Sequence, residues 1–534
     1  MNRREFVKFG ALAGGALLSR PTPMFSWSGD SAANLNPQDP EGFSNPLRLP
    51  GQDGILGLFE PQSPFTIQAA SAATTILPDK QTSILAYGVN VDGKSFFNPI
   101  LKIRKDARVT ARLSNGLAQN TIVHWHGLIL DQANDGIPLE AIAPAATYQY
   151  DYMVRNRAST YWYHPHPMPG TAEQVYRGLA SFFLVEDEDD LRLRKALDLQ
   201  LGKTDIPLLI QDKRFDDMGN VMYNPSVDER FMGIMGDTIL VNLTVKPFLE
   251  VTPRIYRFRL LNGSNARIYR FAFMQGSNKQ GFHIIGVDGG FLAQPALASE
   301  LFLAPGERAD ILLDLSDSAE GDELYLKSLA FDPMDNEGMS GSTGMQSATS
   351  MGMGNTGLAD GAEFYILRLQ VGSGSKEQRS IPGMLSTISP INLSSATVRR
   401  VTLSTNPMAM QWYINGYQYD PTQVPIEVRR NSVEIWEIIN EMESMPHPMH
   451  IHGFQFQVLE RVNSPAQVAA LAGTDGLLPT DTGWKDTILV WPGETVRIVL
   501  DFRHPFPGDQ EYVFHCHNLE HEERGMMVNY KVVS

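Results

Sequence analysis

The sequence is poor in cysteine, in long apolar runs and in basic residues. A single cysteine, Cys516, among 534 residues excludes an intramolecular disulfide framework, so the fold must be stabilised by packing. No stretch approaches the roughly 18 consecutive apolar residues of a membrane-spanning helix. The chain has 44 basic and 60 acidic residues, a formal charge of -16. This balance disfavours nucleic acid and anionic membranes as partners and leaves a small neutral or cationic substrate.

The N-terminus indicates export. Arg3 and Arg4 precede a weakly apolar run, residues 9–18, and together they resemble a twin-arginine (Tat) signal peptide. The alternative is a basic N-terminal tail. We expect a signal over residues 1–30, cleavage between residues 20 and 35, and a periplasmic or exported protein without membrane insertion.

Short β-prone segments separated by turn signals fill the rest of the chain, as is typical of β-sandwiches. They form three runs, residues 40–187, 204–372 and 396–534, which we expect to be three domains. A charged connector, residues 186–203, follows the first run and is expected to be a solvated linker or a short helix. A Gly/Ser connector, residues 372–375, follows the second.

Near the C-terminus, a predicted strand runs into His515-Cys516-His517. Successive side chains of a strand point to opposite faces, so Cys516 faces one way and both histidines the other. A thiolate with the imidazole of His521 and the thioether of Met526 is the ligand set of a blue copper site. The two histidines would then serve a second metal centre behind the strand. The alternative is a core cysteine with incidental histidines.

Further histidines occur in pairs. The motifs His124-Trp125-His126, His164-Pro165-His166 and His450-Ile451-His452 each place two imidazoles on one face of an extended backbone. His447 is an odd number of residues from both His450 and His452 and should point away from them. Ten of the twelve histidines are thereby used. We expect the other two, His283 and His504, to be structural.

A Gly/Ser-rich stretch, residues 334–353, contains five methionines. Gly and Ser at this density predict a loop, and thioethers select Cu(I). The stretch is therefore a candidate copper-binding loop, and the alternative is a tolerated insertion. Its methionines are Met334, Met339, Met345, Met351 and Met353.

The motifs His-Trp-His-Gly, His-Pro-His, His-Pro-x-His-x-His and His-Cys-His-x3-His-x4-Met occur in this order over nearly the whole chain. In this the sequence resembles the multicopper oxidases, the laccases and their relatives. The resemblance implies an all-β fold of three consecutive cupredoxin-like Greek-key sandwiches. It also implies four copper ions: one type 1 copper in the third domain, and one type 2 and two type 3 coppers between the first and third domains.

Carried over residue by residue, the resemblance implies three ligand sets. Type 1 copper has His447, Cys516, His521 and axial Met526. Type 2 copper has His124 and His450. The type 3 pair has His126, His164 and His517 on one ion and His166, His452 and His515 on the other.

Four further residues match functional positions of bacterial members. Asp135 and Glu522 resemble carboxylates that deliver protons for water formation, and the alternative for each is surface acidity. Glu443 and Met445, four and two residues before His447, resemble the Asp and Met that bind substrate copper in bacterial cuprous oxidases. Glu443 is one methylene longer than Asp, which puts that site's geometry in doubt. The alternative is a solvated Glu443 and a packed Met445.

The resemblance thus implies a monomeric oxidase that passes four single electrons through Cys516 to dioxygen, which is reduced to two waters. The Met-rich stretch favours Cu(I) or another metal ion as reducing substrate. A general laccase acting on phenols and aromatic amines is the runner-up, and a copper-binding scaffold without catalysis is the alternative of a different class.

Overall fold

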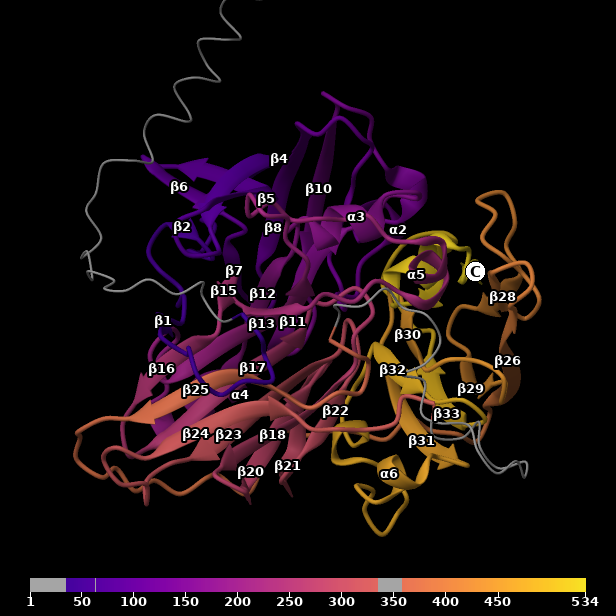
Figure 1. Ribbon diagram of the computed structural model, residues 1–534. Helices are drawn as coiled ribbons and strands as arrows, with labels where there is room; N and C mark the ends of the chain where they lie inside the picture. The colour runs from indigo at the N-terminus through magenta and orange to yellow at the C-terminus, as the bar shows by residue number, and fades with distance from the viewer. Residues whose placement is uncertain (1–34, 63, 335–357) are drawn as a thin grey trace, which may run out of the picture. The chain divides into compact units, whose positions relative to one another are not determined.

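The computed structural model describes residues 35–62, 64–334 and 358–534. The expected signal and the methionines Met339, Met345, Met351 and Met353 lie outside these ranges. No helix in the described ranges is both long and apolar enough to cross a membrane. The described chain is mostly β-strand, as predicted, and its strands form three two-sheet sandwiches along the sequence (Figure 1).

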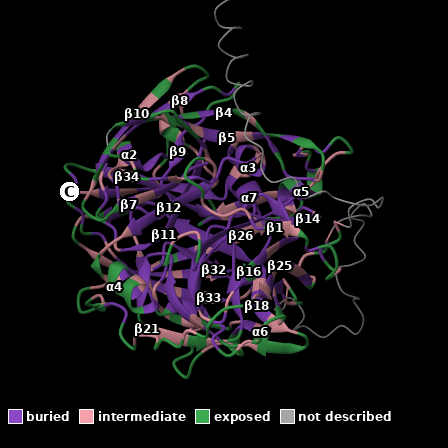
Figure 2. Ribbon diagram, turned by 90° about the vertical axis from the view of Figure 1, so that its left-hand side faces the viewer, coloured by how far each residue is buried: buried purple, intermediate pink, exposed green. Residues whose placement is uncertain are grey.

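The first sandwich buries an apolar core that includes Ile67, Leu113 and Trp125 between its two sheets. One sheet has the order β10 (Thr147–Met153), β8 (Arg108–Asn115), β4 (Phe65–Thr75), β5 (Gln81–Val91), β6 (Lys94–Phe97), β2 (Gly54–Ile55). The other has the order β3 (Leu58–Phe59), β7 (Ile100–Arg104), β12 (Ser181–Glu186), β11 (Ser159–Pro165), β9 (Val123–His124). Every residue of β11 is buried, and Figure 2 shows this strand in the interior.

The second sandwich is the largest of the three in the described chain. Its first sheet contains β1 (Asn45–Pro46), β16 (Pro247–Val251), β25 (Phe364–Val371), β24 (Glu323–Ser328), β18 (Tyr269–Gln275), β19 (Asn278–Gln280) and β22 (Leu301–Leu303). Its second sheet contains β15 (Thr244–Val245), β14 (Thr238–Val241), β13 (Asp205–Lys213), β17 (Ile255–Asn262), β23 (Arg308–Asp314), β20 (Phe282–Val287) and β21 (Gly290–Ala298). Strand β1 lies in the range expected for the first domain but pairs with β16.

The third sandwich carries the C-terminal motifs. One sheet has the order β27 (Gln411–Ile414), β26 (Thr397–Asn406), β29 (Val433–Asn440), β33 (Thr495–Asp501), β31 (Phe456–Val462). The other has the order β28 (Ile426–Arg429), β35 (Met527–Val533), β34 (Gln510–Cys516), β30 (His447–Ile451), β32 (Thr487–Val490). Cys516 and Met526 are part of the core between these sheets.

Short helices connect and cover the sheets. The described α-helices are α2 (Gln132–Asp135), α3 (Thr171–Tyr176), α4 (Glu188–Leu197), α5 (Val227–Met232), α6 (Ala466–Ala469) and α7 (Leu519–Glu523). Helix α7 contacts both α3 and α5, which joins the end of the third sandwich to the earlier parts of the chain.

The charged connector forms helix α4, one of the two expected forms, but one of its faces is not solvated. Asp190 is buried and lies 2.6 Å from Nη1 of Arg257 in β17. The Asp187 side chain accepts hydrogen bonds from the first backbone N–H groups of the helix, which fixes its start. Asp190 therefore ties the connector to the second sandwich, because a buried carboxylate needs a paired cation.

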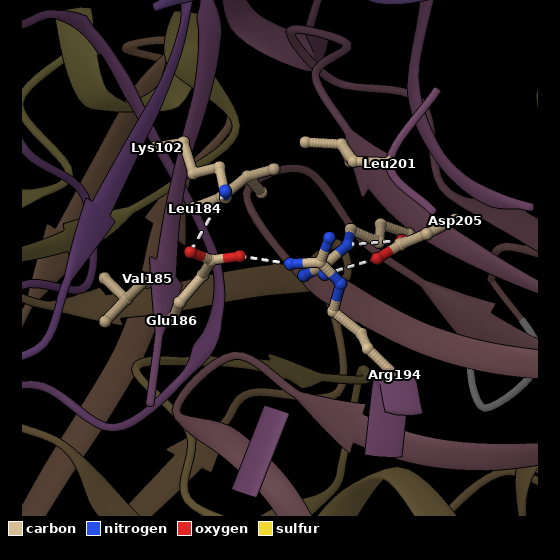
Figure 3. A pocket seen from close by; sticks show the side chains of 8 residues that line it. Lys102, Leu184, Val185, Glu186, Arg194, Leu201 and Asp205 are labelled. Atoms are coloured by element: carbon tan, nitrogen blue, oxygen red, sulfur yellow. Dashed lines mark hydrogen bonds and ion pairs between the residues drawn. The ribbon is translucent and has the colours of Figure 1, made fainter. Parts of the chain in front are cut away.

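A hollow beside this connector is already filled by ion pairs (Figure 3). The Lys102 Nζ atom lies 3.1 Å from a carboxylate oxygen of Glu186, which also pairs with Arg194. Across the hollow, Arg259 donates to both oxygens of Asp205, at 2.7 and 2.8 Å. Since these charges satisfy one another, the hollow is a structural junction, and the candidate site is the buried histidine cluster described next.

Candidate metal centre

Strand β34 divides its last residues between two clusters, as the strand periodicity predicts. It pairs with β30 so that Met449 is opposite Cys516 and His450 is opposite His515. Cys516 points into the core between the sheets of the third sandwich, whereas His515 and His517 join a group of histidines on the other face. The two clusters are therefore separated by one strand and connected by adjacent residues of the chain.

The first cluster contains a thiol and two imidazoles. Sγ of Cys516 lies 3.5 Å from Nδ1 of His447 and 3.5 Å from Nδ1 of His521. The two Nδ1 atoms are themselves 3.2 Å apart. Imidazole nitrogens that face each other this closely need a proton or a cation between them. The cluster fits a metal that accepts one sulfur and two nitrogen ligands.

Local structure places these ligands. Asn518 begins helix α7, and its side-chain oxygen accepts a hydrogen bond from the backbone N–H of His521. Nδ2 of Asn518 lies 3.1 Å from Nε2 of His521, and Oγ of Ser444 lies 2.9 Å from Nε2 of His447. These contacts occupy the outer nitrogen of each ring, so both Nδ1 atoms remain for the metal.

Met526 is tied to the first cluster through its backbone. Its backbone oxygen accepts a hydrogen bond from the N–H of Cys516 at 3.0 Å, and its own N–H donates to the oxygen of His521 at 2.9 Å. The residue is fully buried in the same core as Cys516. The turn after helix α7 thus returns Met526 to the cysteine.

The second cluster contains eight buried histidines from the first and third sandwiches. Strands β9 and β11 pair so that His124 is opposite His164, which joins the two histidine motifs of the first sandwich. The others lie at the ends of β30 and β34 or directly after them. The nitrogens group as three sets within ligand distance of one another: His124, His126 and His450; His126, His164 and His517; His166, His452 and His515.

Short nitrogen-to-nitrogen distances recur in this cluster. Nε2 of His515 lies 3.2 Å from Nε2 of His166 and 3.1 Å from Nε2 of His452. Nε2 of His124 lies 3.3 Å from Nε2 of His450. His517 is buried, and neither of its ring nitrogens has a hydrogen-bond partner among the described residues. Buried donors and acceptors left unpaired are costly, so the arrangement fits bound metal ions.

Burial also sets the protonation of the ligands. It lowers the pKa of His521 to about 3 and that of His166 to about 4. These imidazoles are therefore neutral near pH 7, the form that binds metals. Burial raises the pKa of the Cys516 thiol, so the thiolate needs a nearby positive charge, which a bound metal ion supplies.

The surface alternative considered for Asp135 and Glu522 is wrong, because both side chains are fully buried beside the histidine cluster. Oδ2 of Asp135 lies 2.6 Å from Nδ1 of His452, and the other carboxylate oxygen has no hydrogen-bond partner in the described parts of the chain. The backbone oxygen of Asp135 accepts from Nδ1 of His124 at 2.8 Å. Oε2 of Glu522 lies 3.2 Å from Nδ1 of His515.

The remaining candidates lie at or near the surface. Glu443 is exposed, and Met445 is partly buried against the core of the third sandwich, which is the packing that the alternative describes. Met334 is partly buried at the end of a described range. His283 in β20 and His504, whose ring stacks on Phe506, belong to neither histidine cluster.

Three groups of contacting residues were not predicted. Ser444 and Asn518 contact type 1 candidates, and Asp486 with Thr487 contacts His126 and His450. Arg308, from the second sandwich, pairs with Asp486. Single serines, asparagines and ion pairs have no characteristic spacing, so only the three-dimensional structure relates them to the site.

The buried cluster of one cysteine and two histidines and the eight-histidine cluster, held between β-sandwiches, define a copper protein with one thiolate site and one multi-histidine site. Sequence profiles described as multicopper oxidase match residues 72–190 and 391–534.

Similar proteins agree with this class. The chain is 34% identical over 475 residues to "Multicopper oxidase mco" of Staphylococcus epidermidis, covering 88% of each protein. It is 32% identical over 436 residues to a laccase of Bacillus stratosphericus, covering 76% of this chain and 79% of the laccase. The crystal structure of the McoA multicopper oxidase of Aquifex aeolicus has a TM-score of 0.80 and 39% identity, covering 92% of this chain and 99% of McoA.

The chain belongs to the multicopper oxidase family. It is an oxidoreductase of three cupredoxin-like domains that uses copper, as the resemblance implied. The family also implies dioxygen as acceptor and a reducing substrate.

Proposed function

We propose that the enzyme oxidises Cu(I), or another reduced metal ion, and couples this oxidation to the four-electron reduction of dioxygen to water. The proposal places type 1 copper at His447, Cys516, His521 and Met526, type 2 copper at His124 and His450, and a type 3 pair at the remaining six histidines of the second cluster. Bound copper supplies reversible one-electron transfer at the thiolate site and dioxygen reduction at the histidine cluster.

The chain itself supplies the connection and the protons. Cys516 is bonded through the backbone to His515 and His517, which gives a short covalent path between the two clusters. The carboxylates of Asp135 and Glu522 lie next to His452 and His515, respectively, where they can pass protons to the cluster. The interior position of these carboxylates keeps both groups away from bulk solvent.

The observation that carries Cu(I) as substrate is a concentration of methionine around the core that contains Cys516. Three of the four partly buried apolar side chains that pack against the core containing Cys516 are methionines: Met232, Met410 and Met445. Thioethers are soft ligands that select Cu(I). Met232 comes from α5 and the others from two segments of the third sandwich, so distant parts of the chain bring sulfur to the same core.

Two further methionines are exposed at the edge of the third sandwich where β26 and β29 end. Strands β26 and β29 are parallel, with Leu403 beside Asn440, so the segments that follow them leave the same edge of the sheet. Met408, in the first segment, is 99% exposed, and Met442, in the second, is 48% exposed. A Met-x-Met sequence, residues 408–410, thus lies on the same edge as Glu443 and Met445. We call residues 408, 410, 442, 443 and 445 the sulfur edge.

The sulfur edge gives a direct test. We expect the double variant Met408→Leu/Met410→Leu, and separately Glu443→Gln/Met445→Leu, to lower kcat/KM for buffered Cu(I) by about 10-fold, the smaller of the usual losses when a metal's supporting groups are removed. Activity on a methoxyphenol should stay within about twofold. Leucine is a volume-conserving replacement that removes only the sulfur.

The matched control is Met218→Leu, because Met218 is 76% exposed but belongs to the turn after β13. It should leave both activities unchanged. Equal losses on Cu(I) and on the phenol in the sulfur-edge variants, or no loss on Cu(I), would contradict the proposal and leave a general laccase.

A second test concerns the Met-rich stretch. Deleting residues 334–353 should lower Cu(I) oxidation and spare or raise activity on bulky phenols, because it removes five thioethers that select Cu(I) and that phenols do not need. The two substrates are compared on one purified preparation with equal copper content. Unchanged Cu(I) oxidation would show that this stretch takes no part in the reaction. The sulfur edge would then remain the candidate site for Cu(I).

We further propose that the protein is a monomer, is exported to the periplasm through the twin-arginine signal and acts in copper homeostasis. The supporting observation is the sequence of residues 1–30, because an exported oxidase meets copper outside the cytoplasm. Detection of the mature protein in a periplasmic extract, and its loss on Arg3→Lys/Arg4→Lys substitution, would test the location.

A further inference from the structure

Arg308 connects all three sandwiches at one buried point. Its Nε atom donates to the backbone oxygen of Thr160 in the first sandwich at 2.9 Å. Its two Nη atoms donate to the backbone oxygens of Gly306 and Asp288 in the second sandwich, both at 3.0 Å. The remaining two donors go to Asp486 in the third sandwich. All five donors of the guanidinium group are satisfied, so its position is fixed.

The carboxylate of Asp486 is held as firmly as its partner. It accepts from Nη1 of Arg308 at 2.7 Å on Oδ1 and from Nη2 at 2.6 Å on Oδ2. Such a two-point pair restrains the plane of the carboxylate as well as its place. Both side chains are fully buried, so solvent does not compete for these contacts.

Asp486 in turn contacts a histidine of the second cluster. Nε2 of His126 donates to Oδ1 of Asp486 at 3.0 Å, and Oγ1 of Thr487 lies 3.2 Å from the same nitrogen. Nδ1 of His126 faces Nε2 of His164 at 3.4 Å. The contact with Asp486 therefore places the proton on Nε2 and leaves the Nδ1 lone pair directed into the cluster.

We propose that Arg308 and Asp486 are positioning residues that fix the ring of His126 for copper in the histidine cluster. The second sandwich, which contributes no histidine to either cluster among the described residues, thereby takes part in building the oxygen-reducing site. The inference rests on the proposed function, because it takes His126 to be a copper ligand.

The glycine of the His-Trp-His-Gly motif supports this arrangement. Gly127 has φ +88°, and a Cβ atom there would lie 2.4 Å from Oδ2 of Asp486 and 2.8 Å from Nη2 of Arg308. The residue after His126 must therefore be glycine for the pair to pack against this part of the chain. The motif and the ion pair are parts of one packed unit.

An alternative role for the pair is to hold the sandwiches together without any effect on copper. A matched control separates the two roles. Arg461 and Asp481 form a second buried two-point pair within the third sandwich, at 2.7 and 3.1 Å, and Asp481 contacts none of the candidate copper ligands in any described hydrogen bond or ion pair. Asp481→Asn therefore disrupts a comparable ion pair away from both clusters.

The test compares copper retention in Asp486→Asn, Asp481→Asn and wild-type holoenzyme titrated with a chelator. Metal analysis gives total copper, the visible thiolate-to-copper band reports type 1 copper, and electron paramagnetic resonance reports type 2 copper. We expect Asp486→Asn to release histidine-cluster copper at about 10- to 100-fold lower chelator concentration than wild type, the usual effect of losing a ligand's supporting contact. The type 1 band of Asp486→Asn should match that of wild type. Asp481→Asn should release its copper at the same chelator concentration as wild type.

Arg308→Lys provides a second variant if Asp486→Asn does not fold. Lysine keeps a positive charge but cannot form the two-point contact. We therefore expect Arg308→Lys to lose histidine-cluster copper selectively, but to a smaller extent than Asp486→Asn. Equal copper retention in the Asp486 and Asp481 variants, or parallel loss of type 1 and cluster copper, would overturn the inference. Absence of cluster copper from wild type would instead overturn the proposed function on which the inference rests.

Discussion

Cys516→Ser should yield a folded protein that lacks the blue colour. Its rate of substrate oxidation should fall by more than about 100-fold, because loss of a residue that only supports a metal ligand already costs up to about 100-fold. Serine is close to cysteine in size, and the side chain is fully buried, so the core is expected to keep its packing. The hydroxyl is a hard, poorly ionised donor and cannot replace the thiolate between His447 and His521.

The measurements are the visible spectrum, copper content and turnover of the variant. The matched control is Met449→Leu, because Met449 is opposite Cys516 in the neighbouring strand and is equally buried. The control should keep its colour and its activity. Blue colour or wild-type turnover in Cys516→Ser would show that electrons enter the protein elsewhere.

The division of ligands between two clusters could be predicted because strands have a strict period of two. This period separates Cys516, the last residue of β34, from His515 and His517. It also separates His447, the first residue of β30, from His450 and His452. Each separation depends only on neighbouring residues of one strand. The three-sandwich fold was predictable for a similar reason, since the turn signals and β-prone segments recur along the chain.

The contacts that orient His126 could not be predicted, since they join residues far apart in sequence. Asp486 is 360 residues from His126, and Arg308 is 178 residues from Asp486. Their pairing depends on how three sandwiches pack against one another. A buried ion pair has no local spacing rule, in contrast to a His-x-His motif, so the sequence carries no signal for it.

The proton-donor candidates show the same limit. The resemblance identified Asp135 and Glu522, but their acidic neighbours in the sequence left surface acidity open. In the structure Glu520 is also buried and accepts from Nδ2 of Asn265 at 2.8 Å, whereas Asp135 and Glu522 face histidines of the cluster. Only the fold distinguishes acids that contact the cluster from acids that join domains.

Asp135→Asn and Glu522→Gln should each slow reoxidation of the reduced enzyme by dioxygen by about 100-fold or more, the usual contribution of a positioned acid or base. Each amide keeps the size of the side chain but cannot exchange a proton near neutral pH. Reduction of the type 1 site by substrate should keep its wild-type rate, because neither side chain contacts Cys516, His447 or His521 through a described hydrogen bond or ion pair.

The two carboxylates should differ in their pH dependence. Burial raises the pKa of Asp135, so this group holds a proton to higher pH than an exposed aspartate. Burial also acts to raise the pKa of Glu522, but His166 and His515 outweigh it and lower that pKa to about 2. Glu522 is therefore ionised across the neutral range and does not hold a proton at rest. Asp135→Asn should therefore slow reoxidation most at low pH, where the wild-type carboxyl group is protonated.

Stopped-flow spectroscopy tests both variants in two half-reactions. The blue band should bleach at the wild-type rate when substrate is added without oxygen, and it should return slowly when oxygen is admitted. Glu523→Gln is the matched control, because Glu523 is adjacent to Glu522 but its side chain accepts from the backbone N–H groups of Gly170 and Ala172. If reoxidation in both variants matches that of wild type and of this control, neither carboxylate delivers protons, and the source must be solvent that reaches the cluster directly.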